Sequence, residues 1–517
     1  MTGFTADVII VGAGSAGCVV ARRLVDRGDL NVLLVEAGGP DVNPAIHDPA
    51  RMHELWLSDE DWAYYTVPQR HAADRVLHWP RGRVLGGSSC LNGLIHVRGA
   101  RADYDGWAAR GNDGWAWDDV LPVFKRMEDF DGGESELHGA GGPLSVISRY
   151  PLAPLHESIV AAAQEVGIPR NPDYNSGELD GVSQQQLTIR DGRRHSAAAA
   201  YLRPVIDSPN LHVITGAQVR RLLLVRRRCV GVEWQRDGRL ESAHAGVEVV
   251  ICAGTIASPQ LLLLSGIGPG AELRALGIDV VADLSGVGRN LHDHLLSPAI
   301  FAAERTIDPP APGLSPIQTH LWWRSRSGLP GPDTQPIHFS VPLYEPWMEG
   351  PENGFTLLGG MIRPASRGTI RLSGPDPADP LLIDPNVLAE PGDLSSLLAS
   401  LGQVRELGAA PTLAHEWKAR ELYPGPSVRT AAELRDYVRR TAITYHHQVG
   451  TCRMGIDAEG VVDPRLRVHG IHGLRVADAS VMPAVTSGNT NAPSLLIGER
   501  AADFIVDDAA AGRTEGA

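Results

Sequence analysis

The sequence predicts an α/β fold with a Rossmann-like domain and a second domain that is at least partly β, and three observations support this. Near the start, an apolar run over 8–11 precedes a glycine turn, a helical pattern and a second apolar run over 32–35, which is the order of a βαβ unit. The end of the chain again shows a strand pattern followed by a loop and a helix, whereas residues 300–440 are rich in proline and short strand signals. A chain of 517 residues is also too long to form a single hydrophobic core, so we expect more than one domain.

The individual elements follow from local patterns. The run over 8–11 is continuous rather than alternating, which indicates a strand buried on both faces. Helical periodicity follows over 16–26. Further strands are expected over 211–225, 231–238 and 247–254. A helix over 255–264 then ends at a Gly/Pro stop, and the chain closes with a strand near 474 and a helix from about 494.

Composition narrows the possible partners and compartment. The net charge is 47 − 61 = −14, which disfavours binding to nucleic acid or to anionic membranes. Five scattered cysteines without a C-x-x-C pair argue against a disulfide framework and a zinc site. No apolar run approaches the roughly 20 residues of a membrane span. We therefore expect a cytoplasmic protein without membrane insertion and without a metal ion.

A glycine fingerprint lies between the first strand and the first helix. Gly12 permits the tight turn, Gly14 lets a pyrophosphate approach the backbone, and Gly17 lets helix and strand pack closely. The helix N-terminus offers free N–H groups to an anion. Glu36 ends the second strand, where its carboxylate can accept hydrogen bonds from a ribose and repels a 2′-phosphate. NADP is thus disfavoured, but this pattern does not separate NAD from FAD.

Five further stretches follow in a fixed order along the chain. They read GGSSCLNG (86–93), AGTIASPQLLLLSGIGP (253–269), GVGRNLHDH (286–294), HHQVGTCRMG (446–455) and VADASVMPAVTSGNTNAP (476–493). With the glycine fingerprint, they make the sequence resemble the glucose–methanol–choline (GMC) family of FAD-dependent oxidoreductases, in particular its choline dehydrogenase and alcohol oxidase members. The resemblance covers nearly the whole chain.

The resemblance implies a bound FAD and an α/β fold in two parts. A Rossmann-like FAD-binding domain would be assembled from discontinuous segments, 1–155, 200–305 and 440–517. An α+β substrate-binding domain with an antiparallel sheet would comprise 156–199 and 306–439. The implied cofactor contacts are Gly12, Gly14, Ser15, Ala16, Gly17, Glu36, Ala37, Arg81, Gly87, Ser88, Asn92, Gly93, Val219, Ala253, Gly254, His447, Asp478, Ala479, Asn491, Ala492 and Pro493. Leu91 stands where some members attach the flavin to a histidine, so we expect non-covalent FAD.

Two adjacent histidines, His446 and His447, compete for the catalytic role. Alcohol oxidation by a flavin moves a hydride to N5 and a proton to a base, and a neutral imidazole suits the second task. Adjacent residues of an extended segment point to opposite sides, so we expect at most one to face the flavin. The family histidine lies three residues before the glycine of GT, which selects His447. Asn489 would assist as a donor to the forming alkoxide, and His446 would line the substrate pocket.

The implied reaction is oxidation of an alcohol to an aldehyde. We expect a small primary alcohol, with aromatic or heterocyclic ones included, and O₂ or another electron acceptor. Trp322, Trp323, Tyr344 and Trp347 are candidates for an aromatic pocket wall or for the core. His292 and His294 alternate like two metal ligands, but two ligands do not complete a site. A lyase or a fatty-acid photodecarboxylase on the same scaffold, both using FAD without net alcohol oxidation, is the alternative, and the sequence does not indicate the oligomeric state.

Overall fold

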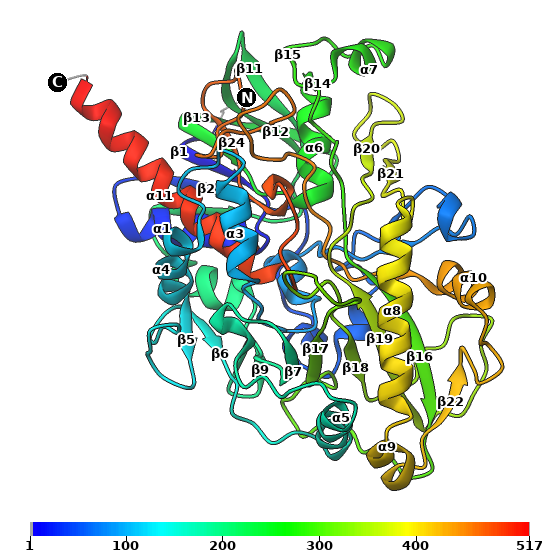
Figure 1. Ribbon diagram of the computed structural model, residues 1–517. Helices are drawn as coiled ribbons and strands as arrows, with labels where there is room; N and C mark the ends of the chain where they lie inside the picture. The colour runs from blue at the N-terminus through cyan, green and yellow to red at the C-terminus, as the bar shows by residue number, and fades with distance from the viewer. Residues whose placement is uncertain (1–3, 516–517) are drawn as a thin grey trace.

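The computed structural model describes residues 4–515, which form two sheets surrounded by helices (Figure 1). In the view of Figure 1, one sheet lies in the upper half with the N-terminal end nearby, the C-terminal helix projects from it to the upper left, and the other sheet lies in the lower half. The helices are α1 (Ser15–Arg27), α2 (Pro44–His47), α3 (Arg101–Ala108), α4 (Trp117–Met127), α5 (Pro154–Glu165), α6 (Gly254–Leu264), α7 (Gly270–Ala275), α8 (Pro391–Gly408), α9 (Pro411–Glu416), α10 (Ala431–Thr441) and α11 (Asn491–Glu515).

The first sheet combines a parallel part with an antiparallel meander. Its strand order is β10-β2-β1-β13-β12-β11, and β24 also pairs with β13. The bounds are β1 (Phe4–Val11), β2 (Val32–Val35), β10 (Leu211–Ile214), β11 (Gln218–Val225), β12 (Arg228–Arg236), β13 (Arg239–Ile251) and β24 (Leu474–Val476). The pairs joining β10, β2, β1, β13 and β24 are parallel, as expected for strands linked by crossovers. The segments before residue 36, near 211–251 and near 474 thus build one sheet, as the sequence predicts.

The second sheet is antiparallel and has the order β22-β16-β19-β18-β17-β7, with β23 pairing with β16. Its strands are β7 (Gly181–Gln184), β16 (Leu295–Ala302), β17 (Thr319–Trp322), β18 (Ile337–Phe339), β19 (Gly354–Met361), β22 (Arg420–Tyr423) and β23 (Ile443–Thr444). The antiparallel sheet was predicted. β16 and β23, however, lie inside segments that the sequence assigns to the FAD-binding domain, so we propose boundaries near 294 and 445 instead of 305 and 440.

Helices cover both sheets. α1 packs against β1, β2 and α11, while α8 packs along β19 and β16 and stands in front of them in Figure 1. The continuous apolar strands β1 and β2 are buried on both faces, because helices and loops cover them. Within residues 4–515, no helix is both long and apolar enough to cross a bilayer.

Short strand pairs and 3₁₀ turns complete the structure. The pairs are β3 (Tyr64–Tyr65) with β4 (His78–Trp79), β5 (Glu128–Phe130) with β6 (Leu144–Val146), β8 (Ile189–Arg190) with β9 (Arg193–Arg194), β14 (Ile267–Gly268) with β15 (Ala282–Asp283), and β20 (Thr369–Arg371) with β21 (Leu382–Asp384). Two of the 3₁₀ turns, Gly87–Cys90 and Ala479–Val481, matter for the site because their residues reach its wall.

Candidate active site

A cavity of about 1310 Å³ extends from the C-terminal ends of β1 and β2 to β16, β18 and β19 of the second sheet. Most of the residues expected at the site line it. These are Gly12, Gly14, Ser15, Ala16, Glu36, Ala37, Arg81, Gly87, Ser88, Asn92, Gly93, Val219, Ala253, Gly254, His446, His447, Asp478, Ala479, Asn489 and Asn491. Gly17, Ala492 and Pro493 do not line it. Gly17 instead packs helix against strand, since a Cβ there would lie 1.9 Å from the Gly12 oxygen.

The glycine loop brings backbone to the cavity surface. Gly12 has φ +97°, and a Cβ there would lie 2.6 Å from the Cys252 oxygen, so only glycine fits. Gly14 is the N-cap of α1 and supplies no side-chain hydrogen bond to the helix. The first N–H groups of α1 are therefore available at the cavity, where the helix dipole favours an anion such as a pyrophosphate.

Glu36 stabilises this loop and still faces the cavity. Its carboxylate accepts hydrogen bonds from Ala13 N (2.7 Å) and Gly38 N (2.8 Å). Burial raises the pKa of Glu36, while these N–H groups and Arg83 act in the opposite direction. Each carboxylate oxygen accepts one of these two hydrogen bonds and has a further lone pair, so the group can also accept from a ribose hydroxyl.

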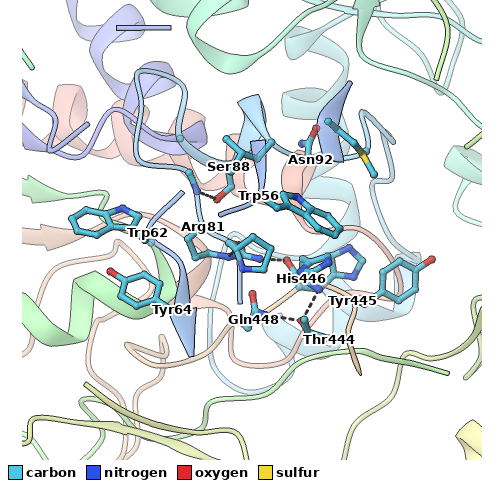
Figure 2. A pocket seen from close by; sticks show the side chains of 18 of the residues that line it. Trp56, Trp62, Tyr64, Arg81, Ser88, Asn92, Thr444, Tyr445, His446 and Gln448 are labelled. Atoms are coloured by element: carbon cyan, nitrogen blue, oxygen red, sulfur yellow. Dashed lines mark hydrogen bonds between the residues drawn. The ribbon is translucent and has the colours of Figure 1, made fainter. Parts of the chain in front are cut away.

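A second loop lies directly on the first. Gly87 has φ +53°, and a Cβ there would be 2.7 Å from Gly14 Cα. Ser88 Oγ accepts from Gly82 N at 3.0 Å, which closes the loop on itself (Figure 2). This contact lets the loop place Ser88 and Asn92 on the cavity wall beside the glycine fingerprint.

The C-terminal segment completes the same end of the cavity. Asp478 accepts from Gly254 N (2.9 Å), Ser258 Oγ (2.6 Å) and Ser480 N (2.8 Å). Burial raises the pKa of Asp478, and these donors oppose the rise. Asn491, the first residue of α11, accepts from Ser15 Oγ at 2.8 Å, so the N-termini of α1 and α11 meet at the cavity. The arrangement fits an extended dinucleotide cofactor with its phosphates at α1.

His447 is held by three neighbours at the other end of the cavity. Its N–H donates to Asp293 Oδ1 (2.8 Å), its Nδ1 lies 3.0 Å from His294 Nδ1, and its ring stacks on Tyr445 with centroids 4.5 Å apart. The residue is 6% exposed. Burial lowers the pKa of His447 well below its usual value, and His294, His446 and Arg81 lower it further. The imidazole is therefore neutral near pH 7.

Strand pairing explains why these residues meet. β16 and β23 are antiparallel, with Leu295 opposite Thr444, and Tyr445 N donates to His294 O at 3.0 Å. Asp293 also binds side chains of the segment 444–448. Its Oδ2 accepts a hydrogen bond from Thr444 Oγ1 and another, at 3.1 Å, from Gln448 Nε2. Burial raises the pKa of Asp293 to about 6, and the donors around it oppose the rise. No local motif marks Asp293 or His294 as a partner of His447, because only the tertiary pairing places them beside it.

His446 also lines the cavity, contrary to a simple alternation of side chains. Its φ of +66° is left-handed, so the segment is not extended at this residue and both rings can reach the cavity. Arg81 Nη2 donates to His446 O at 2.8 Å, and the His446 ring lies 5.1 Å from that of Trp56 (Figure 2). A non-glycine residue in this conformation is strained, which is typical of functional sites.

Asn489 is oriented by a residue that the sequence did not single out. Gln335, which is fully buried, donates Nε2–H to Asn489 Oδ1 at 3.1 Å. Because its oxygen is occupied, the amide nitrogen of Asn489 is the atom available to donate to a ligand. His447 and Asn489 both line the cavity, although they come from different segments.

The structure separates the four aromatic residues that the sequence left open between pocket wall and core. Of the four candidates, only Tyr344 lines the cavity; Trp322 is fully buried, and Trp347 is 44% exposed beneath Arg440. The rest of the aromatic lining comes from Trp56, Trp62, Tyr64, Phe339 and Tyr445. Trp322 packs on Tyr174 and His320 because its strand turns this residue to the core. In the described residues, no group of three or more His, Cys, Asp or Glu is placed to hold a metal ion.

Comparisons with known proteins agree with this geometry. The GMC oxidoreductase models match residues 6–296 and 364–498. An alcohol dehydrogenase (acceptor) of Pseudomonas putida is 40% identical over 97% of this chain and 95% of its own, and an oxygen-dependent choline dehydrogenase of Brucella suis is 37% identical with the same coverage. The crystal structure of pyridoxine 4-oxidase from Mesorbium loti superposes with a TM-score of 0.92, at 38% identity over 96% of this chain and 98% of that one.

One cavity with a dinucleotide-binding loop at one end and a histidine and an amide at the other is typical of an oxidoreductase with a nucleotide cofactor. The chain belongs to the GMC oxidoreductase family, which confirms the predicted resemblance and the fold. It is an alcohol-oxidising enzyme, and its cofactor is FAD. The residues present fit that cofactor: the α1 N-terminus has no side-chain cap, Gly87 and Gly14 allow close approach, and Glu36 directly follows β2.

Proposed function

We propose that this enzyme oxidises neutral primary alcohols with an apolar body to aldehydes, with His447 as the base and Asn489 as a donor to the alcohol oxygen. The observation that carries the proposal is the neutral, clamped imidazole of His447 at the apolar end of the FAD cavity. FAD supplies the hydride acceptor, its N5 atom. The alcohol loses one hydride from carbon and one proton from oxygen, so an aldehyde is formed.

His447 is suited to take the proton because it is uncharged and fixed. Its backbone N–H is bound to Asp293 and its ring is stacked on Tyr445, so its position changes little when a substrate arrives. Nδ1 is engaged with His294, which leaves Nε2 as the nitrogen that can receive the hydroxyl proton. The amide nitrogen of Asn489, oriented by Gln335, can donate to the oxygen as negative charge develops on it.

The substrate class follows from the cavity wall. Leu296 of β16, Ile337 and Phe339 of β18, and Leu358 of β19 line the part formed by the second sheet. Such a surface favours an alkyl or aromatic body over a charged one. This supports the expected small primary alcohols, with aromatic or heterocyclic alcohols included.

The carboxylates argue against a quaternary ammonium substrate such as choline. Of those lining the cavity, Glu36 and Asp478 bind backbone N–H groups at the nucleotide end, Glu345 pairs with Arg75 at 3.5 Å, and Asp308 lies in an exposed loop. Asp293 accepts three hydrogen bonds. Among the described residues, none of the carboxylates that line the cavity is both buried and unpaired, and the guanidinium of Arg81 would repel a cation there.

The remaining expectations stay proposals. Leu91 stands at the position of the covalent histidine, which supports non-covalent FAD. The five cysteines are free and buried, as in a reducing compartment such as the cytoplasm. O₂ or another acceptor would take the electrons. The lyase and photodecarboxylase alternatives gain no support, since the named relatives are dehydrogenases and oxidases.

Anaerobic mixing with a panel of alcohols tests the function. We expect benzyl-type and n-alkyl primary alcohols to bleach the oxidised flavin band, and choline at the same concentration to do so at least about 100-fold more slowly. Choline as the best substrate would refute the proposed substrate class, and no bleaching by any alcohol would refute the reaction. Parallel assays with O₂ and with an artificial dye then identify the acceptor.

A further inference from the structure

The contact between His294 and His447 joins two ring nitrogens of the same kind. His294 Nδ1 and His447 Nδ1 lie 3.0 Å apart, and the ring planes are nearly perpendicular at 89°. A hydrogen bond between two imidazole nitrogens requires a proton on one of them and a lone pair on the other. The contact therefore couples the tautomers of the two rings.

The surroundings of His294 decide which nitrogen carries the shared proton. Burial lowers the pKa of His294 to about 3, with further lowering by His292 and Arg363, so this ring is neutral and has one N–H. The backbone carbonyl of Ile362 favours a proton on the ring. Nδ1 faces His447, so Nε2, which is buried and makes no hydrogen bond in the structure, is the nitrogen left to carry the single N–H of the neutral ring.

From this geometry we propose that His294 is a positioning residue, which accepts the Nδ1 proton of His447 and thereby keeps Nε2 of His447 unprotonated and directed to the substrate. The opposite arrangement would place the His447 proton on Nε2 and abolish its function as a base. When Nε2 receives the alcohol proton, the Nδ1–H of the imidazolium still has its acceptor, so the charge that appears during the reaction remains hydrogen-bonded.

Two hydrogen bonds to the main chain hold the His294 and His447 rings in this contact. Asp293, the residue before His294, accepts the His447 N–H, while Tyr445, two residues before His447, donates its N–H to His294 O. The two backbones are thus fixed on both sides of the ring contact. His292, in contrast, uses both nitrogens elsewhere, on Asn290 O and Val485 N. Of the two histidines in the sequence His-Asp-His, only His294 therefore touches the base.

Two variants at one position separate positioning from packing. His294→Leu keeps the volume but removes the acceptor, and we expect the rate constant of flavin reduction at saturating alcohol to fall about 100-fold. The dissociation constant of the alcohol should change less than about threefold. His294→Asn offers Oδ1 near the former Nδ1, and it should restore the rate to within about tenfold of the wild type. A control is His320→Leu, since His320 is equally buried in the second sheet but touches Tyr174 and Trp322 instead.

The tautomer itself can be observed without turnover. Nitrogen-15 NMR of the oxidised holoenzyme labelled at histidine, with His447→Ala used to assign the signal, should show Nδ1 of His447 protonated and Nε2 unprotonated. Protonated Nε2, or His294→Leu reducing the flavin as fast as the wild type, would overturn the proposal. The inference rests on the proposed function. Failure of all alcohols to reduce the flavin of the wild type would reject only that function, because the NMR spectrum decides the tautomer independently. The NMR test also remains decisive if His294→Leu does not fold.

Discussion

Ser15 and Asn491, the first residues of the first and last α-helices, are joined by a 2.8 Å hydrogen bond although 476 positions separate them. The contact brings two helix N-termini, each with a partial positive charge, to one end of the cavity. It also makes the nucleotide end of the site dependent on both ends of the chain.

The contact between Gly87 and Gly14 should be sensitive to a single methyl group. Gly87→Ala places a Cβ 2.7 Å from Gly14 Cα in a left-handed backbone that costs alanine about 1–2 kcal/mol. The loop must then move away from the glycine fingerprint. We expect at least about tenfold weaker FAD binding, seen as a lower flavin-to-protein absorbance ratio after gel filtration.

Gly106→Ala is the matched control for this prediction. Gly106 lies inside α3, and a Cβ there meets no atom within 4 Å. Alanine is favoured over glycine in a helix by about 1 kcal/mol, so this variant should keep its FAD and melt at the same or a slightly higher temperature. Equal FAD loss in both variants would show that the Gly87 contact is not specific.

Glu499 should be important for the stability of α11. Its carboxylate is fully buried and accepts from Arg23 of α1 at 2.8 Å and from Arg126 of α4 at 2.9 Å. Because both arginines are partly exposed and can turn to water, we expect Glu499→Ala to lower the free energy of unfolding by about 2 kcal/mol. Denaturant unfolding measures this change in the free energy of unfolding. The control is Asp26→Ala, which removes an exposed pair with Arg22 and should lower the free energy of unfolding by less than about 0.5 kcal/mol.

The raised pKa of Asp293 predicts a pH dependence of stability. Burial raises it from 3.8 to about 6, so between these values the folded state binds more protons than the unfolded state. The free energy of unfolding contributed by this group is then greatest below pH 4 and falls as the pH rises to 6, by about 3 kcal/mol in total. Asp293→Asn should gain stability relative to the wild type across this window. A difference that is constant from pH 4 to pH 7 would contradict the pKa direction.

The nucleotide end could be predicted from the sequence because its signals are local. The strand–turn–helix order around Gly12 and Gly14 and the carboxylate of Glu36 lie within one βαβ unit, where the backbone fixes their relation. The candidate pair His447 and Asn489 came from the resemblance alone, and the structure places both on the same cavity. Their contact with a substrate stays a prediction.

Residues whose role depends on tertiary pairing could not be predicted in the same way. His294 resembled half of a metal site, and only the register of β16 against β23 shows that it contacts His447. Gln335 belongs to no recognisable sequence motif. Its contribution is one hydrogen bond to Asn489, which is distant in the sequence. The sequence left Trp322 open between pocket wall and core, because composition does not show which face of a strand is buried.

The central claim is that the imidazole of His447 takes the alcohol proton. His447→Ala removes that base but leaves the glycine loops and Glu36 unchanged, so the variant should purify with the same FAD content as the wild type. In anaerobic stopped-flow mixing with a saturating primary alcohol, we expect flavin reduction to slow by roughly 10³-fold. A flavin-loaded variant that is reduced within about threefold of the wild-type rate would contradict the account.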